Sequence, residues 1–130
     1  MNKTMVGTGA ALGLLAVMLG ALGAHALRDL LAPESLESYQ TGVQYQMYHA
    51  LFLLFLGLNA KLPRRERLIA FRLVVVGVLC FSGSIYALST AALTGLDFTP
   101  VAWVTPLGGL FLIAGWAWLL YRTLFESPGT

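Results

Sequence analysis

The side chains of this sequence that could do chemistry inside a membrane gather in one short stretch, TGVQYQMYHA, at positions 41–50. Together with a histidine earlier in the chain, its candidate polar residues are His25, Gln44, Tyr45, Gln46, Tyr48 and His49. Imidazoles on facing helices of a bundle commonly hold a haem iron, so His25 and His49 could ligate one. On a helix, Tyr45 and Gln46 could each hydrogen-bond the His49 imidazole instead. The stretch therefore indicates either a cofactor site or a network of buried hydrogen bonds.

The difference in membrane depth between His25 and His49 argues against one iron bound by both. If the first helix crosses from Met5, His25 lies about 30 Å along it, at the outer boundary, whereas His49 lies ~12 Å below that boundary. Met47 and His49 point to roughly opposite sides of a helix, and the single cysteine, Cys80, provides no metal motif. We therefore expect no metal, no catalytic residue and no resident cofactor, with haem as the weaker alternative, and we do not expect an enzyme.

The elements that must position these residues are predicted to be membrane helices. Of the 130 residues, 58% are hydrophobic and 11% charged, and the mean hydropathy is +0.76. That balance lies outside the range of a soluble domain. Three apolar runs, 5–24, 73–96 and 101–121, each match the roughly 20 residues that cross ~30 Å of hydrocarbon. The composition predicts an integral membrane protein.

A fourth span requires a separate argument, because the apolar run 50–60 gives only about 16 Å of helix. Pro33 with the glutamates that follow it predicts a helix start, and no residue before Pro63 breaks the helix apart from isolated glycines. A helix over 33–60 would enter the membrane near Thr41, after a short amphipathic extension on the outer side. The polar stretch then lies in the outer half of the bilayer, where unpaired polar groups are costly and should be buried in protein.

We predict one all-α domain, an integral membrane four-helix bundle with spans at about 5–25, 41–60, 70–94 and 103–122. The link between the second and third spans carries four basic residues, Lys61, Arg64, Arg65 and Arg67. The positive-inside rule places this link and both termini in the cytoplasm. The link is expected to fix topology and to contact anionic lipid. The start of the chain also imitates a secretory signal, but its apolar core is longer than usual for one, so we expect a retained first helix.

Small residues at helical spacing predict where the helices pack, since they let backbones approach closely in a membrane. In the first helix Gly9 and Gly13 are followed at about four-residue steps by Ala16, Gly20 and Ala24. The predicted packing glycines of all four helices are Gly9, Gly13, Gly20, Gly42, Gly57, Gly77, Gly108 and Gly115.

The polar residues of the second helix point two ways. Gln46 falls in the sector of Gly42 and Gly57, whereas Gln44 and Tyr48 project onto a different face. This division is typical of a helix in the middle of a bundle or at a subunit contact.

The segments GALGAHALRDLL and PESLESYQTGVQYQMYHAL resemble the small bacterial family catalogued as domain of unknown function 423 (DUF423), whose animal relatives are transmembrane protein 256-like. The resemblance covers most of the chain, is densest from Gly20 to Leu51, and includes the two HAL triplets that begin at His25 and His49. It implies a multi-pass protein of similar size in the bacterial inner membrane. The family has no agreed biochemical activity, so the resemblance implies no reaction.

Three classes of function are compatible with the sequence. We favour a non-catalytic accessory or structural subunit, because the glycine seams suit contacts with other helices and little of the chain lies outside the membrane. The alternative is a small-solute or ion transporter or channel that uses the outer-leaflet polar pocket. A second alternative is a histidine-ligated haem or redox subunit. The expected partners are the lipid bilayer and another membrane protein or a second copy, and not a nucleic acid.

Overall fold

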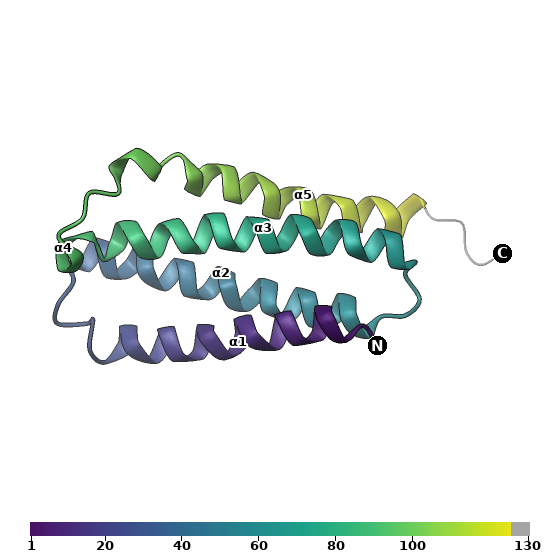
Figure 1. Ribbon diagram of the computed structural model, residues 1–130, viewed down its shortest axis with the longest axis horizontal. Coiled ribbons are helices and arrows are strands. Elements are labelled where there is room, and N and C mark those ends of the chain that lie inside the picture. The colour runs from purple at the N-terminus through teal and green to yellow at the C-terminus, as the bar shows by residue number, and fades with distance from the viewer. Residues whose placement is uncertain (126–130) are drawn as a thin grey trace.

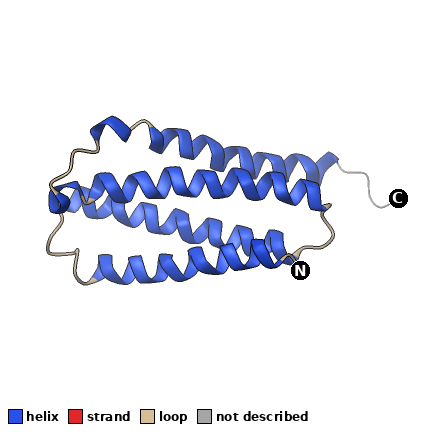
Figure 2. Cartoon of the chain, viewed as in Figure 1, coloured by secondary structure: helices blue, strands red, loops and turns tan. Residues whose placement is uncertain are grey.

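The computed structural model describes residues 1–125, which form an all-helical structure (Figures 1 and 2). Its four long helices are α1 (Lys3–Ala24), α2 (Pro33–Leu58), α3 (Arg64–Ser89) and α5 (Val104–Phe125). A single helical turn, α4 (Ala91–Thr94), and a 3-10 turn, η1 (Thr99–Val101), lie in the link between α3 and α5. The prediction of an all-α chain with four long helices is confirmed.

The four long helices lie in a row, in the order α1, α2, α3, α5, and run alternately in opposite directions (Figure 1). α1 packs on α2, α2 on α3 and α3 on α5, and no comparable contact joins α1 to α5. The start of α1, the end of α5 and the link between α2 and α3 lie at the same end. In a closed bundle the first and last helices would also pack together. The four helices of the predicted bundle thus form an open layer, with α1 at one edge.

Local sequence explains where the helices begin. The Asn2 side-chain oxygen accepts the Met5 N–H at 3.1 Å and so caps the N-terminus of α1. Pro33 occupies the first turn of α2, where its missing N–H costs nothing, and α2 continues to Leu58, close to the predicted end of the second helix. α3 begins directly after Pro63.

The end of α3 comes earlier than the apolar run predicted. Thr90 directs both its N–H and its hydroxyl to the Tyr86 carbonyl, at 3.2 and 2.7 Å, and α3 stops at Ser89. The short α4 then ends at Gly95, whose φ of 71° is the left-handed conformation that favours glycine after a helix.

Three helical segments are long and apolar enough to cross a membrane: Lys3–Ala24, Arg64–Ser89 and Thr99–Phe125. α2 does not qualify by composition, because its first half is polar. Large apolar side chains are exposed on every long helix, as Leu14, Leu58, Leu79 and Ile113 show. A soluble monomer rarely exposes so much contiguous apolar surface, so this exposure indicates a lipid environment.

Buried apolar side chains form two clusters at opposite ends of the layer. The larger lies toward the start of α1 and the link between α2 and α3, and consists of Met5, Phe52, Leu53, Leu56, Ala70, Val74, Val78 and Leu112. The smaller, near the other end, consists of Leu27, Leu31 and Tyr39. Buried polar side chains lie between the two clusters.

Glycines allow close backbone contact between neighbouring helices. A Cβ atom added to Gly9 would lie 2.8 Å from the Ala50 carbonyl oxygen, and one added to Gly57 would lie 2.9 Å from the Val6 nitrogen. At six of the eight predicted positions an added Cβ would overlap a neighbouring helix; these are Gly9, Gly42, Gly57, Gly77, Gly108 and Gly115.

Gly13 and Gly20 also face α2, but with more room than the other six. A Cβ there would make ordinary contacts, 3.7 Å to Ala50 Cβ and 3.4 Å to Val43 Cγ1, respectively. α1 instead buries Gly9, Ala16 and Gly23, which repeat every seven residues. A seven-residue repeat keeps small residues at the seam between helices that coil around each other, whereas four-residue steps drift away from it.

Candidate functional site: a polar network and an adjoining groove

Gln46 is the centre of the buried polar network and is only 4% exposed. Its Nε2 donates to the Leu12 carbonyl of α1 at 2.8 Å, and its Oε1 accepts from the Tyr86 hydroxyl of α3 at 2.6 Å. One amide therefore joins three helices. With both ends of the amide paired in a low-dielectric interior, these bonds stabilise one arrangement of the helices.

Two further bonds extend the network along α2. The Tyr39 hydroxyl donates to the Leu19 carbonyl of α1 at 2.5 Å, and the Ser82 hydroxyl of α3 donates to the Gly42 carbonyl at 2.7 Å. Gly42 must lack a side chain here, because a Cβ would lie 2.9 Å from Tyr86 Cε1. We call Tyr39, Gln46, Ser82 and Tyr86 the three-helix network.

His49 forms a separate contact, with α5. The Trp116 indole N–H donates to His49 Nε2 at 3.0 Å, and His49 Nδ1 lies 2.6 Å from the Tyr45 carbonyl. An indole can only donate, so Nε2 carries the lone pair and Nδ1–H donates to the carbonyl. His49 is 4% exposed and both its ring nitrogens have protein partners. Ligation of a haem or metal by His49 would require one of these bonds to break.

His25 does not share a site with His49. It follows the last residue of α1, where its backbone N–H bonds to the Ala21 carbonyl, and its side chain is exposed. His49 points toward α5, which lies at the other side of the layer from α1 (Figure 1). Among residues 1–125, no group of three or more His, Cys, Asp or Glu side chains is placed to hold a metal ion. The geometry gives the haem hypothesis no support.

Gln44, Tyr45 and Tyr48 also depart from the prediction of one buried network, because all three are exposed on the described chain. Gln44 precedes Gln46 by two residues, about 200° around a helix, and therefore lies on another face. Tyr48 is 53% exposed. Tyr45 lies between these faces and packs its ring on Phe81, with 4.9 Å between centroids.

Several members of the site were not predicted in these roles. Tyr39 precedes Gln46 by seven residues, so the heptad pattern could have identified it. No pattern in the sequence indicated that Tyr86 would join the three-helix network. Trp116 is 50% exposed, but its indole N–H binds His49. That contact joins two helices far apart in the sequence, which no local pattern predicts.

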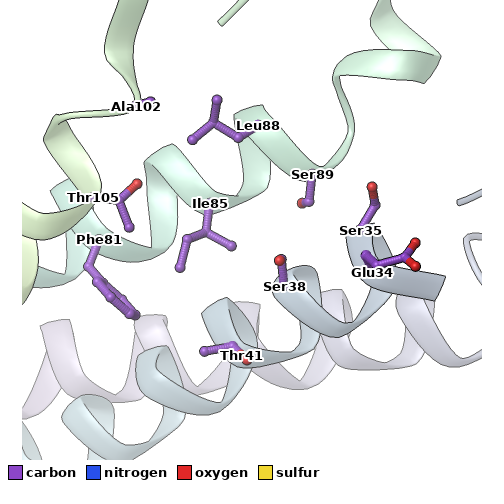
Figure 3. A pocket seen from close by; sticks show the side chains of 10 residues that line it. All are labelled: Glu34, Ser35, Ser38, Thr41, Phe81, Ile85, Leu88, Ser89, Ala102 and Thr105. Atoms are coloured by element: carbon purple, nitrogen blue, oxygen red, sulfur yellow. The ribbon is translucent and has the colours of Figure 1, made fainter. Parts of the chain in front are cut away.

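Two hollows lie between α2 and α5, and Phe81 of α3 lines both of them; together we call them the groove. The first, of about 580 Å³, lies at the N-terminal end of α2 (Figure 3), and we call it the hydroxyl hollow. Its polar lining consists of Glu34, Ser35, Ser38, Thr41, Ser89 and Thr105. The second, of about 710 Å³, is lined mostly by apolar side chains of α5, and we call it the apolar hollow.

The groove provides no continuous polar path among the residues that line it. Beyond Phe81 its polar groups are those of Tyr45, His49 and Trp116, and the nitrogens of the last two bond to each other. A solute that needs hydrogen bonds would lose them at Phe81. This geometry favours an amphipathic occupant over a hydrophilic one.

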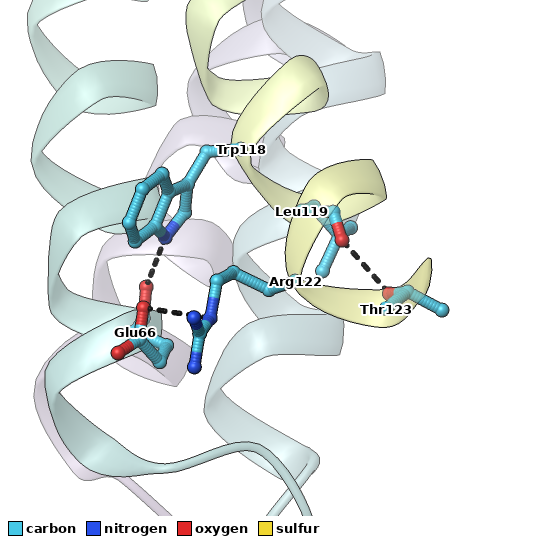
Figure 4. Close-up of polar contacts among 5 residues, drawn as sticks. All are labelled: Glu66, Trp118, Leu119, Arg122 and Thr123. Atoms are coloured by element: carbon cyan, nitrogen blue, oxygen red, sulfur yellow. Dashed lines mark hydrogen bonds and ion pairs between the residues drawn. The ribbon is translucent and has the colours of Figure 1, made fainter. Parts of the chain in front are cut away.

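At the other end of the layer, an ion pair joins α3 to α5 (Figure 4). Arg122 Nε lies 3.2 Å from Glu66 Oε2, and the Trp118 indole N–H donates to the Glu66 carbonyl at 3.2 Å. The Arg122 guanidinium also lies 5.9 Å from the centre of the Trp118 ring. Both partners are only partly exposed, so this pair is screened less than a surface pair.

The four basic residues of the link between α2 and α3 divide into two groups. Lys61, Arg64 and Arg65 are exposed, as a role in contacting lipid requires. Arg67 is half-buried and its Nη1 donates to the Leu56 carbonyl of α2 at 3.3 Å. Arg67 therefore also holds α3 against α2.

Asp97 lies in the link between α4 and η1. Hydrogen bonds from the Thr99 side chain and from the Thr99 backbone N–H, 2.9 Å from Oδ1, lower the pKa of the Asp97 carboxyl below its ordinary value. Asp97 thus orders the turn before α5.

These features define a class: a helical, multi-pass membrane protein whose helices are joined by glycine contacts and buried side-chain hydrogen bonds. Residues 19–109 match the family described as "Protein of unknown function (DUF423)". The chain belongs to this family, as its sequence predicted.

Relatives from several bacteria match nearly the whole chain. A "UPF0382 membrane protein" of Haemophilus influenzae is 35% identical over 115 residues, 88% of each chain. The "UPF0382 membrane protein YwdK" of Bacillus subtilis is 40% identical over 116 residues, 88% of this chain and 90% of YwdK. The "UPF0382 inner membrane protein YgdD" of Escherichia coli is 36% identical over 111 residues, 83% of this chain and 79% of YgdD. No solved structure matches the chain significantly. The protein is a multi-pass protein of the bacterial inner membrane.

Proposed function

We propose that this protein is a non-catalytic component of the inner membrane that packs against the helices of another membrane protein or of a second copy of itself. The exposed polar face of α2, formed by Gln44 and Tyr48, carries this proposal. Among residues 1–125, neither Gln44 nor Tyr48 makes a side-chain hydrogen bond. The ring of Tyr48 does contact the ring of Tyr45. Polar groups that face hydrocarbon without a partner are costly, and a neighbouring helix would satisfy them.

We further propose four spans, at about 5–25, 41–60, 70–94 and 103–122, with the start of α1 and the basic link in the cytoplasm. The support is the common location of the start of α1, the end of α5 and residues 61–67 at one end of the layer (Figure 1), together with the positive-inside rule. With the boundary near Thr41, Tyr48 lies about 10 Å below it at ~1.5 Å per residue. At that depth the backbone of Tyr48 lies within the hydrocarbon layer.

Affinity purification of the full chain in a mild detergent, followed by native mass spectrometry and identification of bound proteins, tests the function. We expect a complex, either with another membrane protein or as an oligomer. Two interhelical hydrogen bonds in a membrane contribute about 0.6 kcal/mol each. Replacement of both Gln44 and Tyr48 by Leu should therefore reduce the recovered complex roughly tenfold, since tenfold is ~1.4 kcal/mol.

Gln40→Leu is the matched control. It makes the same substitution one helical turn earlier, at the outer boundary, where water can hydrogen-bond to the native amide. It should leave recovery close to that of the native chain. If the native chain is recovered only as a lone monomer, the proposal is wrong.

A further inference from the structure

We propose that the groove between α2 and α5 holds one chain of a phospholipid whose amine-bearing headgroup lies in the hydroxyl hollow. This site is distinct from the exposed polar face of α2 and goes beyond the proposed function. Phe81 lines both hollows, so one molecule can extend from hydroxyl-bearing walls into an apolar channel. Such a lining matches a molecule with a polar head and a hydrocarbon tail.

The length of the apolar hollow is close to the thickness of a single leaflet. Along α5 the apolar hollow is lined from Gly109 to Leu120. At ~1.5 Å per residue this is about 16 Å. Half of the ~30 Å hydrocarbon core is about 15 Å. The hydroxyl hollow includes Thr41, where the proposed spans place the membrane boundary, so its polar lining lies at the depth of lipid headgroups.

The hydroxyl hollow has the chemistry to bind a phosphate or ester oxygen. Figure 3 shows that Ser35 and Ser38 of α2 and Ser89 of α3 border the same space. The hydroxyls of Ser35 and Ser38 make no hydrogen bond to another described residue, so both can donate to a ligand. Hydroxyl donors to an ionised phosphate form strong, charge-assisted bonds.

Charge selects the headgroup. Glu34 is the one charged side chain among the residues that line the two hollows, and neither hollow includes a lysine or arginine. Its carboxylate attracts an ammonium group and repels a headgroup with net negative charge. The geometry therefore favours a zwitterionic lipid with a primary amine, such as phosphatidylethanolamine, over anionic phosphatidylglycerol.

The apolar hollow has room for the tail because two small residues line it. Gly109 and Ala117 of α5 lie along the groove, and a Cβ added at Gly109 would still be 3.8 Å from the Phe81 ring. Because both residues line the apolar hollow, a larger side chain at either position would occupy the space of the tail.

Native mass spectrometry of the delipidated full chain, titrated with phosphatidylethanolamine or phosphatidylglycerol of identical acyl chains, tests the proposal. We expect one phosphatidylethanolamine to bind at least fivefold more tightly than phosphatidylglycerol. Ala117→Phe should weaken that binding at least tenfold, whereas Ala11→Phe, at an exposed alanine of α1, should not. Gly109→Leu serves as a second groove variant, and thermal unfolding verifies that each variant is folded.

The headgroup is tested separately with Glu34→Gln, which should reduce the preference between the two lipids to about onefold. Glu37→Gln, at an exposed glutamate that does not line the groove, should preserve the preference. Equal binding of both lipids by the native chain would overturn the proposal. So would equal lipid binding by the Ala117→Phe and Ala11→Phe variants, or a photo-crosslinker at position 117 that captures a protein helix in native membranes.

Discussion

Gln44 and Gln46 carry the same amide on the same helix, two residues apart, yet their surroundings are opposite. Gln46 is buried and bonded to α1 and α3, whereas Gln44 is exposed and makes no side-chain hydrogen bond within the described chain. The helical period alone separates them. The comparison teaches that polar residues in α2 divide by face: one face stabilises the fold, whereas the other makes no side-chain hydrogen bond within the described chain, as the proposed contact with a partner requires.

The largest effect is expected where α1 meets the buried face of α2. Gly9→Ala would place a Cβ 2.8 Å from the Ala50 carbonyl oxygen, so the backbones must separate. We expect a loss of about 1–3 kcal/mol in the free energy of unfolding, typical of overpacking. Reversible unfolding in detergent measures it.

Gly13→Ala is the matched control on the same helix. The added Cβ would be 3.7 Å from Ala50 Cβ, an ordinary contact, so stability should be unchanged or slightly higher. Equal destabilisation by the two substitutions would show that the seam of α1 does not follow the seven-residue repeat.

A smaller effect is expected for Gln46→Leu, which removes the bonds to the Leu12 carbonyl and to the Tyr86 hydroxyl and leaves that hydroxyl without its acceptor. The expected loss is about 1–2 kcal/mol in the free energy of unfolding. Gln44→Leu should change the stability of the isolated chain by less than ~0.5 kcal/mol, as usual for an exposed position. If Gln44→Leu is as destabilising as Gln46→Leu, the contrast between the two faces is wrong.

The smallest effect is expected at the contact between α2 and α5. Trp116→Phe keeps an aromatic ring beside Phe52 but removes the indole donor to His49, at a cost of about 1 kcal/mol. Nitrogen NMR should show the Nδ1–H tautomer of His49 in both chains, because the Tyr45 carbonyl still accepts that proton, but the Nε2 resonance should shift in the variant as its indole donor is lost. Trp103→Phe, at a side chain that is 64% exposed, should alter neither stability nor the His49 spectrum. An unchanged His49 spectrum in Trp116→Phe would contradict the assigned bond.

Features set by local sequence were predicted well. The start of α2 at Pro33, its small-residue face and the separate direction of Gln44 all follow from helix capping and the helical period. The partners of those faces were not predicted. The bonds of Gln46 to Tyr86 and of His49 to Trp116 depend on which helices become neighbours and on side-chain rotamers.

The glycine seams illustrate the same limit. Gly9 and Gly13 are equally small, and only the way α1 coils on α2 decides that the first is in close contact and the second is not. Likewise, a small-residue face indicates that a helix packs, but not whether the last helix returns to the first. That is why the sequence predicted four packed helices but not their arrangement in an open layer.

The open layer also has a consequence for biosynthesis. Because the order of the helices in space is their order in the sequence, each helix that leaves the ribosome meets the neighbour made just before it. Such short-range contacts incur little loop-closure entropy and favour fast assembly. The protein can therefore be inserted and packed largely one helix at a time from its N-terminus, and the contact of His49 with Trp116 forms last, when α5 arrives.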